Sequence, residues 1–257
     1  MKLYFLGTGT STGVPQIGCE CEVCTSQDPR DRRMRTSAIV EHDGKRLLID
    51  VGPDFYHQIL KAGAPSLEAL IVTHSHYDHV GGIDDLRPYC AVSPNHHFPV
   101  YCQADVDTDL RSRVPYCFAE HPYPGVPTFT VNDIKPYESF RVGPFNILPL
   151  EIIHYKLHIL GFKINNLAYI TDAKTVPEAT IDAIKGIDTL VINSLRKREH
   201  MSHLSLHESL EIIDRVKPRM AWLTHLSHQM GLHPKVESEL PPNVRIAYDG
   251  LCIEIPD

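Results

Sequence analysis

Short apolar runs rich in β-branched residues alternate along this chain with turn-forming residues and with stretches whose apolar positions recur at helical spacing. The runs have the length of strands and fall short of a membrane span. They predict strands at residues 1–6, 37–41, 46–51, 69–72, 145–153, 159–164, 167–170, 189–193 and 220–224. Helical spacing predicts helices at residues 55–62, 82–91, 105–114, 177–184 and 203–216. Two strand-rich halves that each carry helices indicate an α/β protein.

No domain boundary, repeat or low-complexity tract interrupts the chain, and 257 residues suffice for one substantial core. We therefore expect a single domain over residues 1–257. Residues 93–145 carry the weakest pattern, because eight prolines punctuate them. We interpret this part as surface turns around short strands and the helix at residues 105–114.

Four side chains that can bind metals follow the buried run at residues 69–72 on a single loop. His74, His76, Asp78 and His79 lie within six consecutive positions, at the edge where open α/β sheets usually place their ligands. His74 and His76 should point the same way from an extended backbone, whereas Asp78 and His79 follow after the chain has begun to turn. One loop can therefore supply ligands to two metals. The alternative interpretation is a solvated polar loop.

A dense cluster of thiols lies near the N-terminus, at Cys19, Cys21 and Cys24. Thiolates this close repel one another unless a metal or a disulfide relieves them, and in a cytosolic chain a metal is favoured. A tetrahedral zinc site needs a fourth ligand, and no fourth cysteine lies nearby. The alternative is a group of free thiols. The seven cysteines are an odd number, which argues against a complete disulfide framework.

Charge and composition narrow the range of partners. The formal net charge is −7, from 25 basic and 32 acidic residues, and no stripe of Lys and Arg stands out. We therefore expect no nucleic-acid partner. The N-terminus runs straight into a glycine loop and lacks the apolar core of a signal peptide, so we expect a cytoplasmic protein and no membrane partner. The 16 histidines favour metal chemistry.

The loop motif His74-x-His76-x-Asp78-His79 resembles the HxHxDH signature of the metallo-β-lactamase superfamily. This resemblance implies a four-layer αβ/βα sandwich with its active site at one edge, between the two sheets. It also implies two divalent metals in the active site, either zinc or manganese. Such metals share a water and lower its pKa toward about 7 for attack on the substrate.

The superfamily uses three further ligands, a His, an Asp and a His, and this chain offers one for each at the end of an apolar strand. They are His154, Asp172 and His225. By the resemblance, one metal is assigned to His74, His76 and His154. The other is assigned to Asp78, His79 and His225, with Asp172 as the bridging carboxylate. Asp50, which closes an earlier strand, is the acidic residue expected to buttress the metal loop.

Three further motifs resemble the phosphoribosyl cyclic phosphate phosphodiesterases of phosphonate breakdown, and this resemblance covers nearly the whole chain. The motifs are Gly18-Cys19-x-Cys21-x-x-Cys24, Leu223-Thr224-His225-x-Ser227-His228-Gln229 and Tyr248-Asp249-Gly250. The resemblance implies a structural zinc bound by the three cysteines and His228, in a loop at about residues 18–35. It makes Asp78 and His203 the candidate catalytic residues. His203, which we expect at the start of a helix, would protonate the leaving oxygen.

The function that these resemblances imply is that of a metal-dependent phosphodiesterase acting on a small cyclic phosphate, such as phosphoribosyl cyclic phosphate. The sequence is compatible with a homodimer. Arg87 and Lys156 are candidates for contact with the phosphate, with a solvated charge as the alternative for both. Three other functions stay open: a tRNA 3′-end-processing endonuclease, a thioester or lactone hydrolase, and a scaffold protein that retains the fold. The acidic net charge argues against the first, and the complete ligand set argues against the last.

Overall fold

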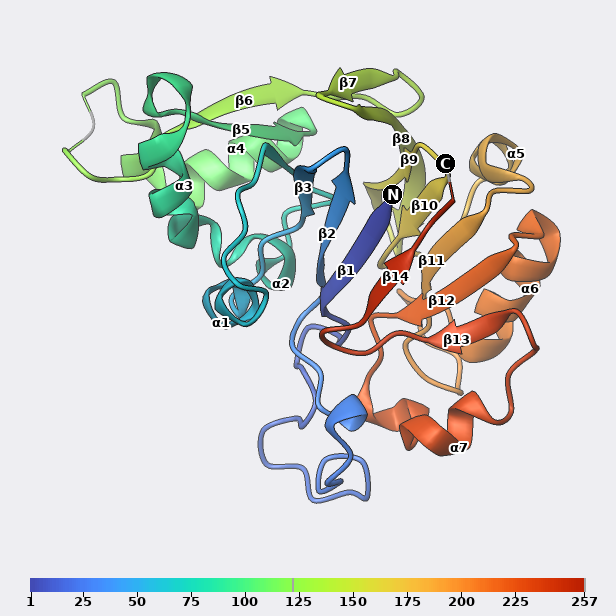
Figure 1. Ribbon diagram of the computed structural model, residues 1–257. Coiled ribbons are helices and arrows are strands. Elements are labelled where there is room, and N and C mark those ends of the chain that lie inside the picture. Colours follow the sequence, from blue (N-terminus) through green and yellow to red (C-terminus); the bar gives the residue numbers. More distant parts are fainter. Residues whose placement is uncertain (122, 257) are drawn as a thin grey trace.

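Two sheets of seven strands each face one another in the computed structural model, which describes residues 1–121 and 123–256 (Figure 1). The strands of the first sheet are β1 (Lys2–Gly7), β2 (Ser37–His42), β3 (Lys45–Ile49), β4 (Ala69–Ile71), β5 (Phe98–Cys102), β6 (Phe129–Asp133) and β14 (Cys252–Glu254). Those of the second are β7 (Phe140–Val142), β8 (Phe145–His154), β9 (Leu157–Ile164), β10 (Leu167–Ile170), β11 (Thr189–Asn193), β12 (Met220–Thr224) and β13 (Val244–Ile246). The strand orders are β14-β1-β2-β3-β4-β5-β6 and β13-β12-β11-β10-β9-β8-β7.

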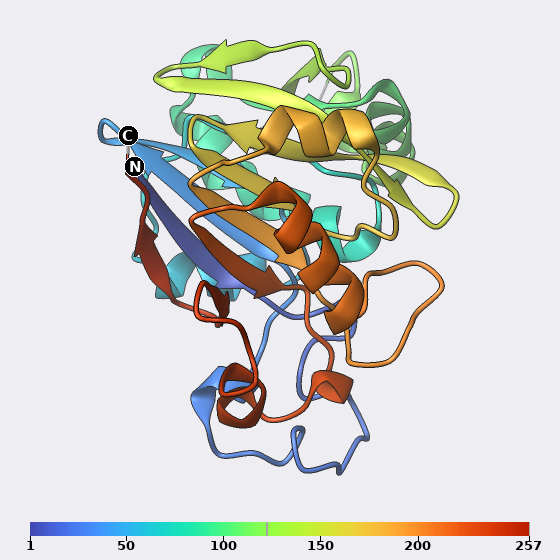
Figure 2. The same cartoon turned by 90° about the vertical axis from the view of Figure 1, so that its right-hand side faces the viewer.

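Helices cover the outer face of each sheet, which gives four layers. The first sheet packs against α1 (Phe55–Lys61), α2 (Tyr77–Val80), α3 (Arg87–Val92) and α4 (Ala104–Arg113). The second packs against α5 (Glu178–Ile184) and α6 (Leu206–Val216), which lie in front of it in Figure 2. The short α7 (His233–Glu237) lies beside the long loop that follows β1 (Figures 1 and 2). The four-layer αβ/βα sandwich predicted from the sequence is thus confirmed.

Alternation along the strands explains why the sheets can be covered on both faces. In β1, Leu3 and Phe5 belong to the core between the sheets, whereas Leu6 belongs to the core beneath the helices of the first sheet. Successive side chains of a strand point to opposite faces, so one strand contributes to two apolar layers. The loops at the strand ends are then the part of each sheet that is left for polar side chains.

Strand directions bring several of these loops to one edge. β3 and β4 pair in parallel, as do β10, β11 and β12. β8 runs antiparallel to β9, and β9 runs antiparallel to β10, so β8 and β10 share a direction. The segments that follow β3, β4, β8, β10 and β12 therefore lie at the carboxyl-end edges of the sheets, where such folds bind ligands.

The structure departs from the predicted elements in a few places. The helix predicted at residues 82–91 is a 3-10 turn at Ile83–Leu86 followed by α3. The helix predicted from residue 203 begins at Leu206, because Ser205 and Glu208 form a capping box in front of it. β13, β14 and α7 were not predicted. None of the helices in the described ranges is long and apolar enough to cross a membrane.

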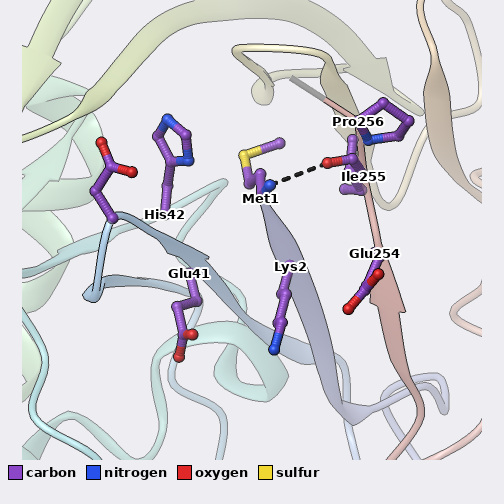
Figure 3. Close-up of a pocket in the computed structure, with 8 residues that line it drawn as sticks. Met1, Lys2, Glu41, His42, Glu254, Ile255 and Pro256 are labelled. Atoms are coloured by element: carbon purple, nitrogen blue, oxygen red, sulfur yellow. Dashed lines mark hydrogen bonds between the residues drawn. The ribbon is translucent and has the colours of Figure 1, made fainter.

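A cavity of about 430 Å³ lies at the end of the first sheet opposite to the loop that carries His74 to His79 (Figure 3). Its lining includes Met1, Glu41, His42 and Glu254, and the amine of Met1 donates a hydrogen bond of 3.0 Å to the carbonyl oxygen of Ile255. β2 leads from the metal-loop edge to His42, so the cavity and the metal loop lie at opposite ends of the strands. The cavity is therefore separate from the predicted metal site.

Candidate metal centre

The loop between β4 and α2 sends its metal-binding side chains to two places. The backbone of His76 is extended, with φ −61° and ψ 149°, and α2 begins at the next residue. His74 and His76 therefore leave an extended segment, and Nε2 of His74 lies 3.0 Å from Nδ1 of His76. Asp78 and His79 belong to the helical turn, and both are buried. The change of backbone conformation at His76 separates the four side chains into two pairs.

Strand ends supply the remaining side chains. β8 ends at His154, Asp172 follows β10 by two residues, and His225 comes directly after β12. Asp50, Asp172 and His225 all have left-handed backbones, with φ of 57°, 57° and 56°. Such conformations cost energy in residues other than glycine, and they concentrate at functional sites. Each follows the end of a strand within two residues, and its polar side chain is buried.

Two groups of potential ligand atoms result, with the atoms of each group lying within 4.8 Å of one another. The groups are His74, His76 and His154, and Asp78, His79, Asp172 and His225. Asp172 also groups with His154 and His203, so it lies between the two sets. Its Oδ1 is 3.2 Å from Nε2 of His225, and its Oδ2 is 3.2 Å from Nε2 of His79. Asp172 thus contacts two imidazoles of its own group and also lies close to His154 of the other group.

The chemistry of these donors fits divalent metals. Nε2 of His79 is buried and makes no hydrogen bond within the described chain, although it lies 3.3 Å from Oδ2 of Asp78. Burial lowers the pKa of His74 and of His225, which favours the neutral imidazole that binds metals. Imidazole nitrogens and carboxylate oxygens are common donors to zinc, and carboxylates suit manganese.

Hydrogen bonds on the outer side of the imidazoles hold the ring orientations. Asp50 Oδ2 lies 2.7 Å from Nδ1 of His79, and Asp50 also accepts from the amide of Thr73 at 2.8 Å. The structure therefore places Asp50 where the sequence predicted a buttress. The carbonyl of Ser202 lies 2.8 Å from Nδ1 of His154. Contacts of this kind fix which ring nitrogen is left for a metal.

Sequence reasoning did not identify Ser202, Thr10 or Thr36 as neighbours of the centre. Thr10 and Thr36 contact the two ring nitrogens of His225 at 3.1 and 3.0 Å, across about two hundred residues of sequence. The available signal was the run of hydroxyl residues in the glycine loop after β1, which contains Thr10 but neither Thr36 nor Ser202.

His203 lies beside the centre but not where the sequence placed it. It belongs to the loop before α6 rather than to the helix, and burial lowers its pKa to about 3. Its Nδ1 is 3.6 Å from Oδ1 of Asp172 and has no hydrogen-bond partner among the described residues. The imidazole of His203 therefore lies beside the candidate ligand Asp172.

The two candidate phosphate contacts differ in what surrounds them. Arg87 forms an ion pair with Asp84 at 2.9 Å and donates to the carbonyl of Gly125 at 2.6 Å, so its guanidinium already has partners. Lys156 lies in the turn between β8 and β9, with its ammonium 5.3 Å from the centre of the Tyr155 ring. Lys156 is exposed and follows His154 by two residues.

The cysteine cluster lies against His228, which is about two hundred residues away in the sequence. Nδ1 of His228 lies 3.4 Å from Sγ of Cys19 and 3.3 Å from Sγ of Cys21, and Cys24 completes a group within 4.8 Å. The hydrogen bond from His228 is the main cause that lowers the pKa of Cys21 to about 6, which favours the thiolate. Three sulfurs and one imidazole match the ligand set of a structural zinc site.

Replacing Cys24 by alanine should remove one zinc per chain while leaving the active-site metals exchangeable. In the wild-type protein, mild chelation should strip the two active-site metals and leave zinc at the cysteine cluster, because a closed four-ligand site exchanges more slowly. Elemental analysis before and after chelation measures both. Cys252→Ala, which removes an exposed thiol on β14, is the matched control and should retain the zinc. Chelation-resistant zinc in Cys24→Ala would exclude this site.

Comparison with known proteins agrees with this geometry. The model of the beta-lactamase superfamily domain matches residues 45–226. A crystal structure described as a new diphosphatase from the PhnP family superposes with a TM-score of 0.91 at 34% identity, covering 99% of this chain and 98% of that one. Zinc-bound PqqB from Methylobacterium extorquens superposes with a TM-score of 0.81, covering 99% of this chain and all of that one. At 18% identity, this second likeness shows the fold alone.

A relative from Porphyromonas gingivalis named octanoyltransferase is 43% identical over 253 residues, which are 98% of this chain and 51% of the relative. The chain therefore spans about half the length of that relative. The family match covers more than half of the chain and includes the loop motif and the three strand-end residues predicted to be ligands. The chain belongs to the metallo-β-lactamase superfamily, and within it resembles the PhnP family of hydrolases.

Proposed function

We propose that this protein is a dinuclear metal-dependent phosphodiesterase that hydrolyses a small cyclic phosphate, such as a phosphoribosyl cyclic phosphate. The observation that carries the proposal is the pair of ligand groups that both lie close to Asp172, with His203 beside them. Two divalent metals held there would supply an activated water and stabilise charge on the substrate oxygens. The similarity to a PhnP-family structure supports a phosphorus centre as the target.

The chain's own residues divide the remaining work. One metal would be held by His74, His76 and His154. The other would be held by Asp78, His79, Asp172 and His225. Asp78 and Asp172 add the negative charge that balances the metals. His203 would donate a proton to the departing oxygen, which a poor leaving group needs. Burial of these residues excludes bulk water and strengthens their electrostatic interactions.

A panel of substrates tests the proposal. Purified protein loaded with zinc or manganese should hydrolyse cyclic and linear phosphodiesters and act little on phosphomonoesters. The panel includes a diphosphate, because the 34% identical structure is described as a diphosphatase, and a precursor tRNA. Faster turnover of the diphosphate than of any diester would move the proposal to anhydride hydrolysis, and selective cleavage of the tRNA would replace it with the nuclease.

An octanoyl thioester also belongs in the panel. The octanoyltransferase name belongs to a relative about half of which has no counterpart in this chain. Two activating metals can direct water to an acyl carbon as well as to phosphorus. Thioester hydrolysis with no action on phosphodiesters would overturn the proposal in favour of acyl chemistry.

A further inference from the structure

The hydroxyl of Thr36 is fully buried between a carbonyl group and a proposed metal ligand. Its Oγ1 donates a hydrogen bond of 2.9 Å to the carbonyl oxygen of Gly9 and lies 3.0 Å from Nδ1 of His225. A hydroxyl has one proton to donate, and a carbonyl can only accept. The proton of Thr36 is therefore committed to Gly9, so the contact with His225 requires a proton on Nδ1.

Thr171 points to the same tautomer of His225. Its Oγ1 lies 3.5 Å from Nδ1 of His225, and it donates at 2.6 Å to Oδ2 of Asp172. The Thr171 hydroxyl, like that of Thr36, can therefore only accept from the imidazole. With Nδ1 protonated, the lone pair of the neutral ring lies on Nε2, the nitrogen 3.2 Å from Oδ1 of Asp172.

The backbone around Thr36 holds this arrangement in place. Gly9 donates its amide to the carbonyl of Met34, and the amide of Thr10 donates to the carbonyl of Leu226 at 3.0 Å. A Cβ on Gly9 would lie 2.9 Å from the backbone oxygen of Arg33, so only glycine allows this close approach. The acceptor for Thr36 is thus fixed relative to the segment that carries His225.

Thr73 makes an equivalent pair of contacts beside His74, in the other ligand group. Its hydroxyl donates to Oδ2 of Asp50 at 2.8 Å and lies 3.0 Å from Nδ1 of His74. A carboxylate can only accept, so Nδ1 of His74 must donate to Thr73. The two ligand groups each contain an imidazole oriented by a threonine whose own proton is already committed.

We propose that Thr36 is a positioning residue for the metal centre, which fixes His225 as the Nδ1–H tautomer and thereby directs Nε2 at the metal. The assignment rests on the proposed function, because it takes His225 to be a metal ligand. Outer partners of this kind typically contribute about 10–100-fold to metal affinity. Thr36→Val should therefore weaken zinc binding by about that factor, and Thr36→Ser, which keeps the hydroxyl, should bind zinc as wild type does.

The experiment titrates zinc back into protein from which mild chelation has removed the active-site metals, with a competing chelator as reference. Thr180→Val is the matched control, because it removes a fully buried hydroxyl that also donates to a backbone carbonyl, that of Glu151 at 2.7 Å, but lies on α5 and outside both ligand groups. Thr180→Val should bind zinc as the wild type does. Equal losses in the valine and serine variants of Thr36, or none in Thr36→Val, would overturn the proposal.

The tautomer can also be read directly in the zinc-loaded wild-type protein, so the test survives even if Thr36→Val does not fold. Nitrogen-15 histidine labelling should show a proton on Nδ1 of His225, with the signals identified by their loss in His225→Gln. A proton on Nε2 would contradict the assignment. Zinc affinity and tautomer do not depend on the substrate, so an inactive protein would refute the proposed phosphodiesterase without touching this result.

Discussion

Replacing Asp172 by asparagine should lower phosphodiester turnover by roughly 10²–10⁴-fold. The carboxylate is buried, and its two oxygens each lie 3.2 Å from an imidazole, those of His79 and His225. The neutral amide would balance less of the positive charge of two divalent metals, and a loss of about 3–5 kcal/mol of transition-state stabilisation corresponds to this factor, because each 1.36 kcal/mol is a factor of ten in rate. The amide keeps the size of the side chain, so the loss reports charge rather than packing. Steady-state turnover and bound metal should be measured on the same preparation.

Asp188→Asn is the matched control for this variant. Asp188 forms an ion pair with Arg219 at 2.6 Å, at the end of β11 away from the metal loop. The control should keep wild-type turnover and wild-type metal content. Asp172→Asn with both values unchanged would remove Asp172 from the centre and would leave the two ligand groups without a bridge.

The loop motif was readable from the sequence because its ligands are local. The residues from His74 to His79 follow a strand that is recognisable by its apolar residues. The change of backbone conformation at His76 is enough to direct their side chains to two places. The downstream ligands were different. His154, Asp172 and His225 are single residues, and only the family resemblance selected them from many polar residues at strand ends.

Contacts between distant segments were beyond sequence reasoning. Thr36 reaches His225 because β1, β2 and β12 bring the segments at their ends together, and no local pattern records that meeting. The three-residue strands β13 and β14 are too short to show a period, and their pairing with β12 and β1 is what defines them. The weak region at residues 93–145 similarly supplies β5 and the edge strands β6 and β7.

The true start of α6 is signalled in the sequence. Ser205 and Glu208 have the spacing of a capping box, which the helix predicted from residue 203 does not take into account. Reading that signal places His203 in the preceding loop, where an imidazole can turn toward Asp172 instead of lying along a helix. The correction matters for function, because the low pKa of His203 then comes from burial beside the centre.

Replacing His203 by alanine should lower hydrolysis of an alkyl or ribose-type phosphodiester by about 10²–10⁴-fold, the usual contribution of a positioned proton donor. A nitrophenyl diester should be hydrolysed nearly as fast as by the wild type, because nitrophenolate leaves without protonation. Burial keeps His203 neutral in the free protein, and an anionic phosphate beside it favours the protonated ring. The measurement is kcat/KM for both substrates at one pH, together with the metal content.

His207→Ala is the matched control, since His207 is an exposed histidine on α6 that pairs with Glu211 at 3.4 Å. It should hydrolyse both diesters at the wild-type rate. Equal losses on the two substrates in His203→Ala would count against proton donation and favour a role in positioning the substrate. Loss of metal would carry a different meaning, because His203 also lies within 4.8 Å of potential ligand atoms of His154 and Asp172. In that case His203 would itself be a ligand, and the leaving group would need another source for its proton.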